Sequence, residues 1–142
     1  MADYFMNEGV FDLPDVGLVD KTEHFFDGTL ADKSKIGLLI TRRPLPEGKS
    51  LLEMVRRYVE TEAKKLRAYR LLEERQTEWA GLPAIDVSTR YKNQDTMAYQ
   101  RHAHIAAGGQ WIIIAATSEL DRRDACDQAI ERVLTTLELR DM

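Results

Sequence analysis

The sequence feature that most restricts the fold of this 142-residue chain is a Gly108-Gly109 pair. It lies between two segments in which successive side chains are predicted to point to opposite faces of a strand. Consecutive glycines adopt the positive φ angles of a two-residue hairpin turn, so segments 97–107 and 110–118 are predicted to pair as antiparallel strands. A third alternating segment, 84–91, is joined to them by the polar loop 92–95. Strands linked by such short turns predict an antiparallel sheet, because parallel strands need long crossover connections.

Shorter strand signals lie before and between these segments. Residues 4–13 predict a short strand pair around a turn at 7–9, and residues 21–26 a third strand that ends at an Asp27-Gly28 turn. The apolar run 36–41 predicts a strand buried on both faces. The polar segment 69–79 is predicted to be a further strand.

Two segments have helical periodicity. Ser50 and Glu53 form a capping box that opens a predicted helix over 51–66. Its apolar side chains recur every three or four residues and are Leu51, Met54, Val55, Tyr58, Val59 and Ala63. A second helix is expected from an N-cap at Asp121 to about residue 137. The fold class expected is therefore α+β, with two amphipathic helices packed on an antiparallel sheet.

Composition restricts the classes of function. No repeat or linker interrupts the chain, so residues 1–142 are expected to form a single domain. The net charge of −4 leaves no basic surplus for binding nucleic acid. The longest apolar run, 111–116, is far shorter than the roughly 20 residues of a membrane span. The amino terminus lacks the basic start and apolar run of a signal peptide, so we expect a cytoplasmic protein that does not insert into membranes.

No catalytic arrangement stands out, and we expect neither enzyme activity nor a cofactor. The chain has no Gly-x-Ser-x-Gly motif and no phosphate-binding glycine loop. Its one cysteine, Cys126, lies in a predicted helix with no basic or histidine partner, where we expect it to be partly buried.

The alternative is a metal site or an enzyme built on two histidines. His102 and His104 point to one face of a predicted strand, and Asp86 would complete a three-ligand site for zinc or iron. A symmetric 92–95 loop, however, pairs Asp86 with Arg101 and turns Asp86 to the other face. The metal site therefore requires a one-residue shift in strand register, and no metal site is predicted.

The paired strands present two faces with substantial apolar material. A two-residue turn at 108–109 places on one face Ala98, Gln100, His102, His104, Ala106, Trp111, Ile113, Ala115 and Thr117. The opposite face carries Tyr99, Ala103, Ile105, Ile112, Ile114 and Ala116. If the two helices cover one face, the other suits a binding groove or an oligomer interface. The competing hypothesis is a sheet covered on both sides by its own helices and loops.

Several short segments, taken in order, resemble one known family. They are Tyr4, Glu8, Leu13-Pro14-Asp15, Phe25-Phe26, 38–42, Tyr58-Val59-Glu60, 81–84, 95–100 and the apolar strand that ends at Thr117. In this order and spacing the chain resembles the DcrB-related family, and within it the Eag-type chaperones of bacterial type VI secretion. The resemblance implies a PsbP-like fold, usually a homodimer. It also implies a function, which is to bind the amino-terminal apolar transmembrane helices of a secreted Rhs/PAAR-type toxin effector before export.

The resemblance also implies a set of partner-binding residues. They are Gly37, Leu39, Thr41, Tyr58, Ala98, Gln100, His102 and Ile113. Gln100 matches the polar anchor of the family, and its amide both donates and accepts hydrogen bonds. Tyr58 stands where the family has a polar residue facing the groove, and His102 replaces an apolar residue. A further alternative is a regulatory module of PsbP-like fold that binds a folded protein.

Overall fold

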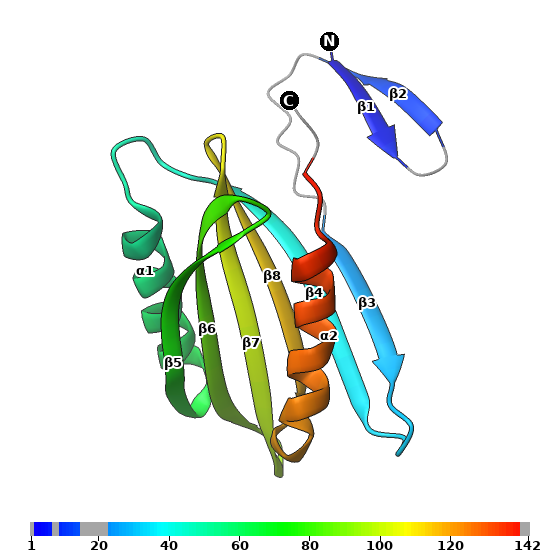
Figure 1. Cartoon of the computed structure of the whole chain (residues 1–142), viewed down its shortest axis with the longest axis vertical. Helices are drawn as coiled ribbons and strands as arrows, with labels where there is room; N and C mark the ends of the chain where they lie inside the picture. Colours follow the sequence, from blue (N-terminus) through cyan, green and yellow to red (C-terminus); the bar gives the residue numbers. More distant parts are fainter. Residues whose placement is uncertain (1, 7–8, 15–22, 140–142) are drawn as a thin grey trace.

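The structure is a computed structural model that describes residues 2–6, 9–14 and 23–139 (Figure 1). Its strands are β1 (Ala2–Met6), β2 (Gly9–Leu13), β3 (His24–Thr29), β4 (Lys35–Pro44), β5 (Arg67–Trp79), β6 (Leu82–Asn93), β7 (Thr96–Ala107) and β8 (Gln110–Glu119). Its helices are α1 (Leu51–Lys65), the short 3-10 helix η1 (Leu120–Arg122) and α2 (Arg123–Thr136). None of the described helices is both long enough and apolar enough to cross a membrane.

Six strands form one antiparallel sheet in the order β3-β4-β8-β7-β6-β5, while β1 and β2 pair with each other in a separate two-stranded sheet. The expected α+β class with an antiparallel sheet is therefore confirmed. The strand pair expected over 4–13 corresponds to β1 and β2. The central residues of its turn, 7 and 8, lie outside the described residues.

The β7–β8 hairpin has the predicted turn and the predicted faces. Ala107 pairs with Gln110, and Gly108 and Gly109 take φ angles of 54° and 80°, which a side chain would strain. The two-residue turn determines the register of the two strands, and the register determines which of their side chains share a face of the sheet.

The β6–β7 turn is shorter than predicted. Asn93 pairs with Thr96, so the turn comprises two residues, and Asp86 lies opposite Ala103 rather than Arg101. The pairing is displaced by two positions, which keeps every side chain on its expected face. Arg101 becomes a diagonal neighbour of Asp86 on that face.

The two helices lie on opposite faces of the sheet, so the arrangement in which both cover one face, considered from the sequence, does not occur. Val55 of α1 packs with Ile85 and Val87 of β6. Ile130 and Leu134 of α2 join the larger core on the other face, and α2 runs over β7 and β8 (Figure 1). Among the described residues, each face is therefore covered by one helix, over part of its width.

Three local expectations are also wrong. Asp27 and Gly28 lie inside β3, where they pair with β4, and the turn comes later in the chain. The segment 36–41 is half-buried rather than buried on both faces, because β4 lies next to the edge strand and only partly under the helices. Asp121 lies within η1, and α2 begins after Arg122 without a side-chain cap.

Candidate functional site

The face of the sheet that carries α1 is open beside the helix. A groove of about 390 Å³ lies there over β4, β8 and β7. We call this hollow the groove, and the residues of its floor are Gly37, Leu39, Ala98, Gln100, Ala115 and Thr117. These side chains align because strand pairing places Gly37, Thr117 and Gln100 in one row across the sheet.

The floor is made mainly of small or apolar residues, and an aromatic ring forms its edge. Phe25 of β3 pairs with Leu39 and lines the groove, yet 66% of its surface is exposed. A side chain at position 37 would meet the Phe25 ring at 3.9 Å, so Gly37 keeps the floor low beside that ring. Exposure of a large apolar ring in a hollow is typical of a surface that binds an apolar partner.

The Gln100 amide and the Thr117 hydroxyl supply hydrogen-bonding capacity on the floor. Gln100 donates from Nε2 to Thr117 Oγ1 across 3.3 Å. An amide has two N–H donors and an acceptor oxygen, so this single bond leaves further capacity for a ligand.

Half of the predicted partner-binding residues lie in the groove, and half lie elsewhere. Gly37, Leu39, Ala98 and Gln100 line it. Thr41 is the next residue on the same face of β4 and pairs with Ile113, which is buried. Tyr58 is part of α1, and its ring lies over His102 of β7 with 5.4 Å between ring centroids.

Two buried histidines and a tryptophan form a hydrogen-bonded cluster under Tyr58. Trp111 Nε1 donates to His104 Nδ1 at 2.9 Å, and His104 Nε2 lies 2.6 Å from His102 Nδ1. The exposed fractions of His102 and His104 are 1% and 0%. Burial lowers the pKa of His102 to about 4, although Asp86 opposes this effect. Burial also lowers the pKa of His104, and the neighbouring His102 and Arg43 add to the effect.

The alternative metal site of Asp86, His102 and His104 is not formed, because Asp86 is on the opposite face of the sheet. The two histidines face α1, whereas the Asp86 carboxylate faces α2 and binds Arg101. Among the described residues, no group of three or more His, Cys, Asp or Glu side chains is arranged to hold a metal ion. Cys126 is fully buried rather than partly buried, and burial raises the pKa of its thiol to about 11.

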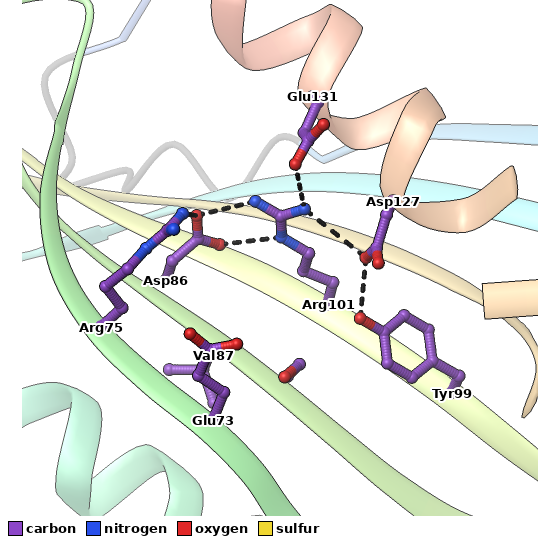
Figure 2. Close-up of a pocket in the computed structure, with 9 residues that line it drawn as sticks. Glu73, Arg75, Asp86, Val87, Tyr99, Arg101, Asp127 and Glu131 are labelled. Carbon is purple, nitrogen blue, oxygen red and sulfur yellow. Dashed lines mark hydrogen bonds and ion pairs between the residues drawn. The ribbon is translucent and has the colours of Figure 1, made fainter. Parts of the chain in front are cut away.

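A charged cleft of about 210 Å³ lies on the α2 face, and sequence reasoning missed it (Figure 2). Arg101 binds Asp86 through two bonds of 2.9 and 3.1 Å, and it reaches Glu131 at 2.8 Å and Asp127 at 3.5 Å. Tyr99 donates its hydroxyl to Asp127 at 2.7 Å. The sequence did contain a signal for it, because Asp86 and Arg101 are charged residues on a strand face that is mainly apolar, and buried charges are usually paired.

The ion pairs of this cleft form a bridge between three elements of the fold. Burial by itself would lower the pKa of Arg101, but its hydrogen bonds with Asp86 and Glu131 outweigh that effect and raise it. Arg101 thus stays charged and links β6, β7 and α2. A guanidinium is not deprotonated in proteins, so Arg101 is a fixed positive charge between these carboxylates.

Comparisons with known structures show which fold this is. A protein from Pseudomonas aeruginosa, PA94, described as a protein of unknown function and a candidate regulator, aligns with a TM-score of 0.87 and 17% identity over 100% of this chain and 99% of its own. LpqN of Mycobacterium tuberculosis, involved in cell envelope biogenesis, aligns with a TM-score of 0.59 and 9% identity over 82% and 83% of the two chains. PsbP (CyanoP) of Synechocystis sp. PCC 6803 aligns with a TM-score of 0.55 and 12% identity over 89% and 95%.

The fold is therefore PsbP-like, as the family resemblance implied. No curated protein sequence matches this chain at a significant level. The family model named DcrB matches residues 8–136, which is most of the chain. The chain belongs to the DcrB family.

Proposed function

We propose that this protein is an Eag-type chaperone that binds the amino-terminal transmembrane helices of a type VI secretion effector and shields them in the cytoplasm before export. The single observation that carries the proposal is the open groove beside α1, with its low apolar floor and exposed Phe25. Such a role requires neither a catalytic residue nor a cofactor.

The shape of the floor suits an apolar helix. Gly37 has no side chain and Ala98 and Ala115 have small ones, which allows a helix backbone to approach closely, as small residues do between membrane helices. Leu39 and Phe25 add larger apolar surface on one side. Burying apolar surface contributes roughly 25 cal/mol per Å², so a few hundred Å² at this groove is enough to stabilise a bound helix.

Gln100 and Thr117 provide for the polar groups of the bound helix. An apolar floor alone would leave a serine, threonine or backbone carbonyl of that helix without a partner, which costs free energy. The Gln100 amide, oriented by Thr117, can donate to such a group and accept from it. This pair therefore favours helices that carry one polar residue among apolar ones.

Co-expression tests the proposal. We expect the effector to be encoded by the gene next to that of this chain. The chain is produced together with the amino-terminal apolar segments of that effector, and the soluble fraction is analysed by light scattering. We expect a soluble complex of defined mass. An insoluble segment beside a soluble, unbound chain would contradict the chaperone function. Capture of a folded protein instead would favour the alternative, a regulatory module.

Two substitutions locate the binding surface. Gln100→Ala is expected to weaken binding of the segment about tenfold, the value of one hydrogen bond to a buried polar group, without loss of folding. Leu39→Asp is expected to reduce binding more, because it places a charge on the apolar floor. Gln128→Ala, on the exposed side of α2, is the matched control. Full solubility of the segment with Gln100→Ala would remove the anchor role, and unfolding of Leu39→Asp would place Leu39 in the core.

A further inference from the structure

The side of α1 that borders the open face carries a basic pocket. A hollow of about 180 Å³ lies between α1 and the ends of β4 and β8. Arg43 of β4 and Arg57 and Lys65 of α1 line it, and we call these three residues the basic flank. Arg57 and Lys65 are eight residues apart, two steps of four along the helix, which places them on the same side of α1.

The position of Arg43 is held by two aromatic rings. Its guanidinium carbon lies 5.3 Å from the centroid of the Tyr58 ring and 5.4 Å from that of Trp111. Trp111 is buried and Tyr58 is half-buried, so both rings are fixed against the sheet. A guanidinium placed in this way loses less conformational freedom when it binds an anion than one on a free side chain.

The basic flank has no acidic partner within the part of the chain that the structure describes. Other basic residues nearby do have one, since Lys49 pairs with Glu53 and Arg56 with Glu74. No carboxylate oxygen of the described residues lies within 4.0 Å of the charged nitrogens of the basic flank. Among the described residues that line the hollow, Glu62 is the one carboxylate, so three positive charges face one negative charge on a chain whose net charge is −4.

The groove and the basic flank lie along one line of the sheet. Gly37, Leu39, Thr41 and Arg43 share one face of β4, and the first two line the groove. Six residues of strand separate Gly37 from Arg43, a span of about 20 Å. A helix laid along β4 covers that span in about 13 residues.

We propose that the basic flank binds an aspartate or glutamate of the segment held in the groove, about 13 residues from the residue that contacts Gly37. This inference rests on the proposed function and adds a rule for choosing among apolar helices. A carboxylate there forms charge-assisted hydrogen bonds with Arg43 and Arg57, while a lysine at the same place is repelled.

Model peptides test the inference. Each peptide is a helix of about 20 residues of alanine and leucine, with one glycine as the residue meant to contact Gly37. Glutamate, glutamine or lysine is placed about 13 positions from that glycine, before it in one set of peptides and after it in a second set. A neutral polyethylene glycol tail keeps the peptides soluble, and a fluorescent label reports binding by anisotropy at low ionic strength. The glutamate peptide is expected to bind about tenfold more tightly than the glutamine peptide, and the lysine peptide more weakly than both.

Substitutions assign the preference to the basic flank. Arg57→Gln, at an exposed site, is expected to reduce the preference for glutamate, and the double variant Arg43→Gln/Arg57→Gln to abolish it. Arg56→Gln is the matched control on the neighbouring helix position, where the side chain already pairs with Glu74. The preference should also fall as salt is added, because exposed charges are screened.

The outcomes separate this inference from the proposed function. Equal binding of the glutamate and glutamine peptides would overturn the basic flank and leave the groove intact. Absence of binding by all peptides would overturn the groove and the inference with it.

Discussion

At the scale of single residues, the histidine cluster under Tyr58 has a defined protonation state. Trp111 donates to His104 Nδ1, so that nitrogen carries no proton, and the neutral ring holds its proton on Nε2. His104 then donates to His102 Nδ1, which places the proton of His102 on its own Nε2. A proton added to either accepting nitrogen would replace a hydrogen bond by repulsion between two N–H groups.

This arrangement predicts loss of stability in mild acid. The pKa of His102 is lowered by burial to about 4, from an ordinary value of 6.5. Between these values the unfolded chain binds a proton that the folded chain does not, so the free energy of unfolding falls as the pH decreases from 6.5 toward 4. The loss from His102 by pH 4.5 is on the order of 2–3 kcal/mol, and thermal unfolding measured by circular dichroism across this range will report it.

Variants separate this loss from general acid effects. His102→Gln is expected to flatten the dependence of the melting temperature on pH below 6.5, because a glutamine does not titrate. His24→Gln is the matched control at an exposed histidine and should follow the parent chain. An unchanged dependence in His102→Gln would show that other groups are responsible.

At the scale of elements, Arg101 joins helix α2 to two strands. Its side chain lies between Asp86 of β6 and Asp127 and Glu131 of α2, while Tyr99 adds a bond to Asp127 (Figure 2). The packing of α2 also depends on apolar residues such as Ile130 and Leu134. Packing of this kind tolerates small shifts of a helix, whereas two hydrogen bonds to one carboxylate hold a fixed direction.

Removing one partner of the buried pair is expected to be costly. Arg101→Met leaves the Asp86 carboxylate buried beside Arg75 alone, which is half exposed and lies 3.4 Å away. We expect the free energy of unfolding to fall by about 3 kcal/mol or more, because a buried charge loses its main partner. Urea unfolding followed by circular dichroism measures this change.

The double variant tests the reason for the loss. Asp86→Leu/Arg101→Met removes both charges and should be more stable than Arg101→Met alone. Arg75→Gln, the control, should change stability by less than about 1 kcal/mol because its pair with Asp86 is partly exposed. If the double variant is as unstable as the single one, lost packing rather than an unpaired charge explains the effect.

The elements differ in how well the sequence predicted them. The alternation around Gly108-Gly109 defines which residues share a face, because the period of a strand is two and the turn length is set by the glycines. The helix from Leu51 was equally predictable from its cap, since Ser50 Oγ accepts from the Glu53 amide at 3.1 Å. Periodicity does not say which face of a sheet a helix covers, and for this reason the placement of α1 and α2 was missed.

For the candidate site, too, the sequence predicted which strand residues share a face but not where the helices lie. Ala98 and Gln100 were placed with Thr117 from strand pairing, and the family resemblance added Gly37 and Leu39. What the sequence did not reveal is that Tyr58 lies over His102, which removes this histidine from the groove. That contact depends on the tertiary position of α1, and no local pattern encodes it.

At the scale of the whole molecule, the two edges of the sheet differ in character. β5, at one edge, is rich in charged residues and has two register irregularities in its pairing with β6, features that discourage pairing with another chain. β3, at the other edge, has its two phenylalanines exposed, Phe25 by 66% and Phe26 by 56%. Adjacent strand residues point to opposite faces, so an apolar ring lies on each side of this edge.

The difference between the edges predicts a homodimer through β3. Within the described residues β3 is an edge strand, and two copies related by a twofold axis can pair their β3 strands antiparallel, which would bond the outer backbone groups of β3 and cover Phe26. Light scattering during size-exclusion chromatography is expected to give twice the mass of the chain.

Phe26→Lys is expected to give the monomer, whereas Leu71→Lys, at an exposed position of the β5 edge, should leave the dimer intact. Phe26 is the residue to change because Phe25 also lines the groove, so loss of the dimer can be distinguished from loss of binding. A dimer that survives Phe26→Lys but dissociates with Leu71→Lys would place the interface at β5, against the charge and irregular pairing of that strand.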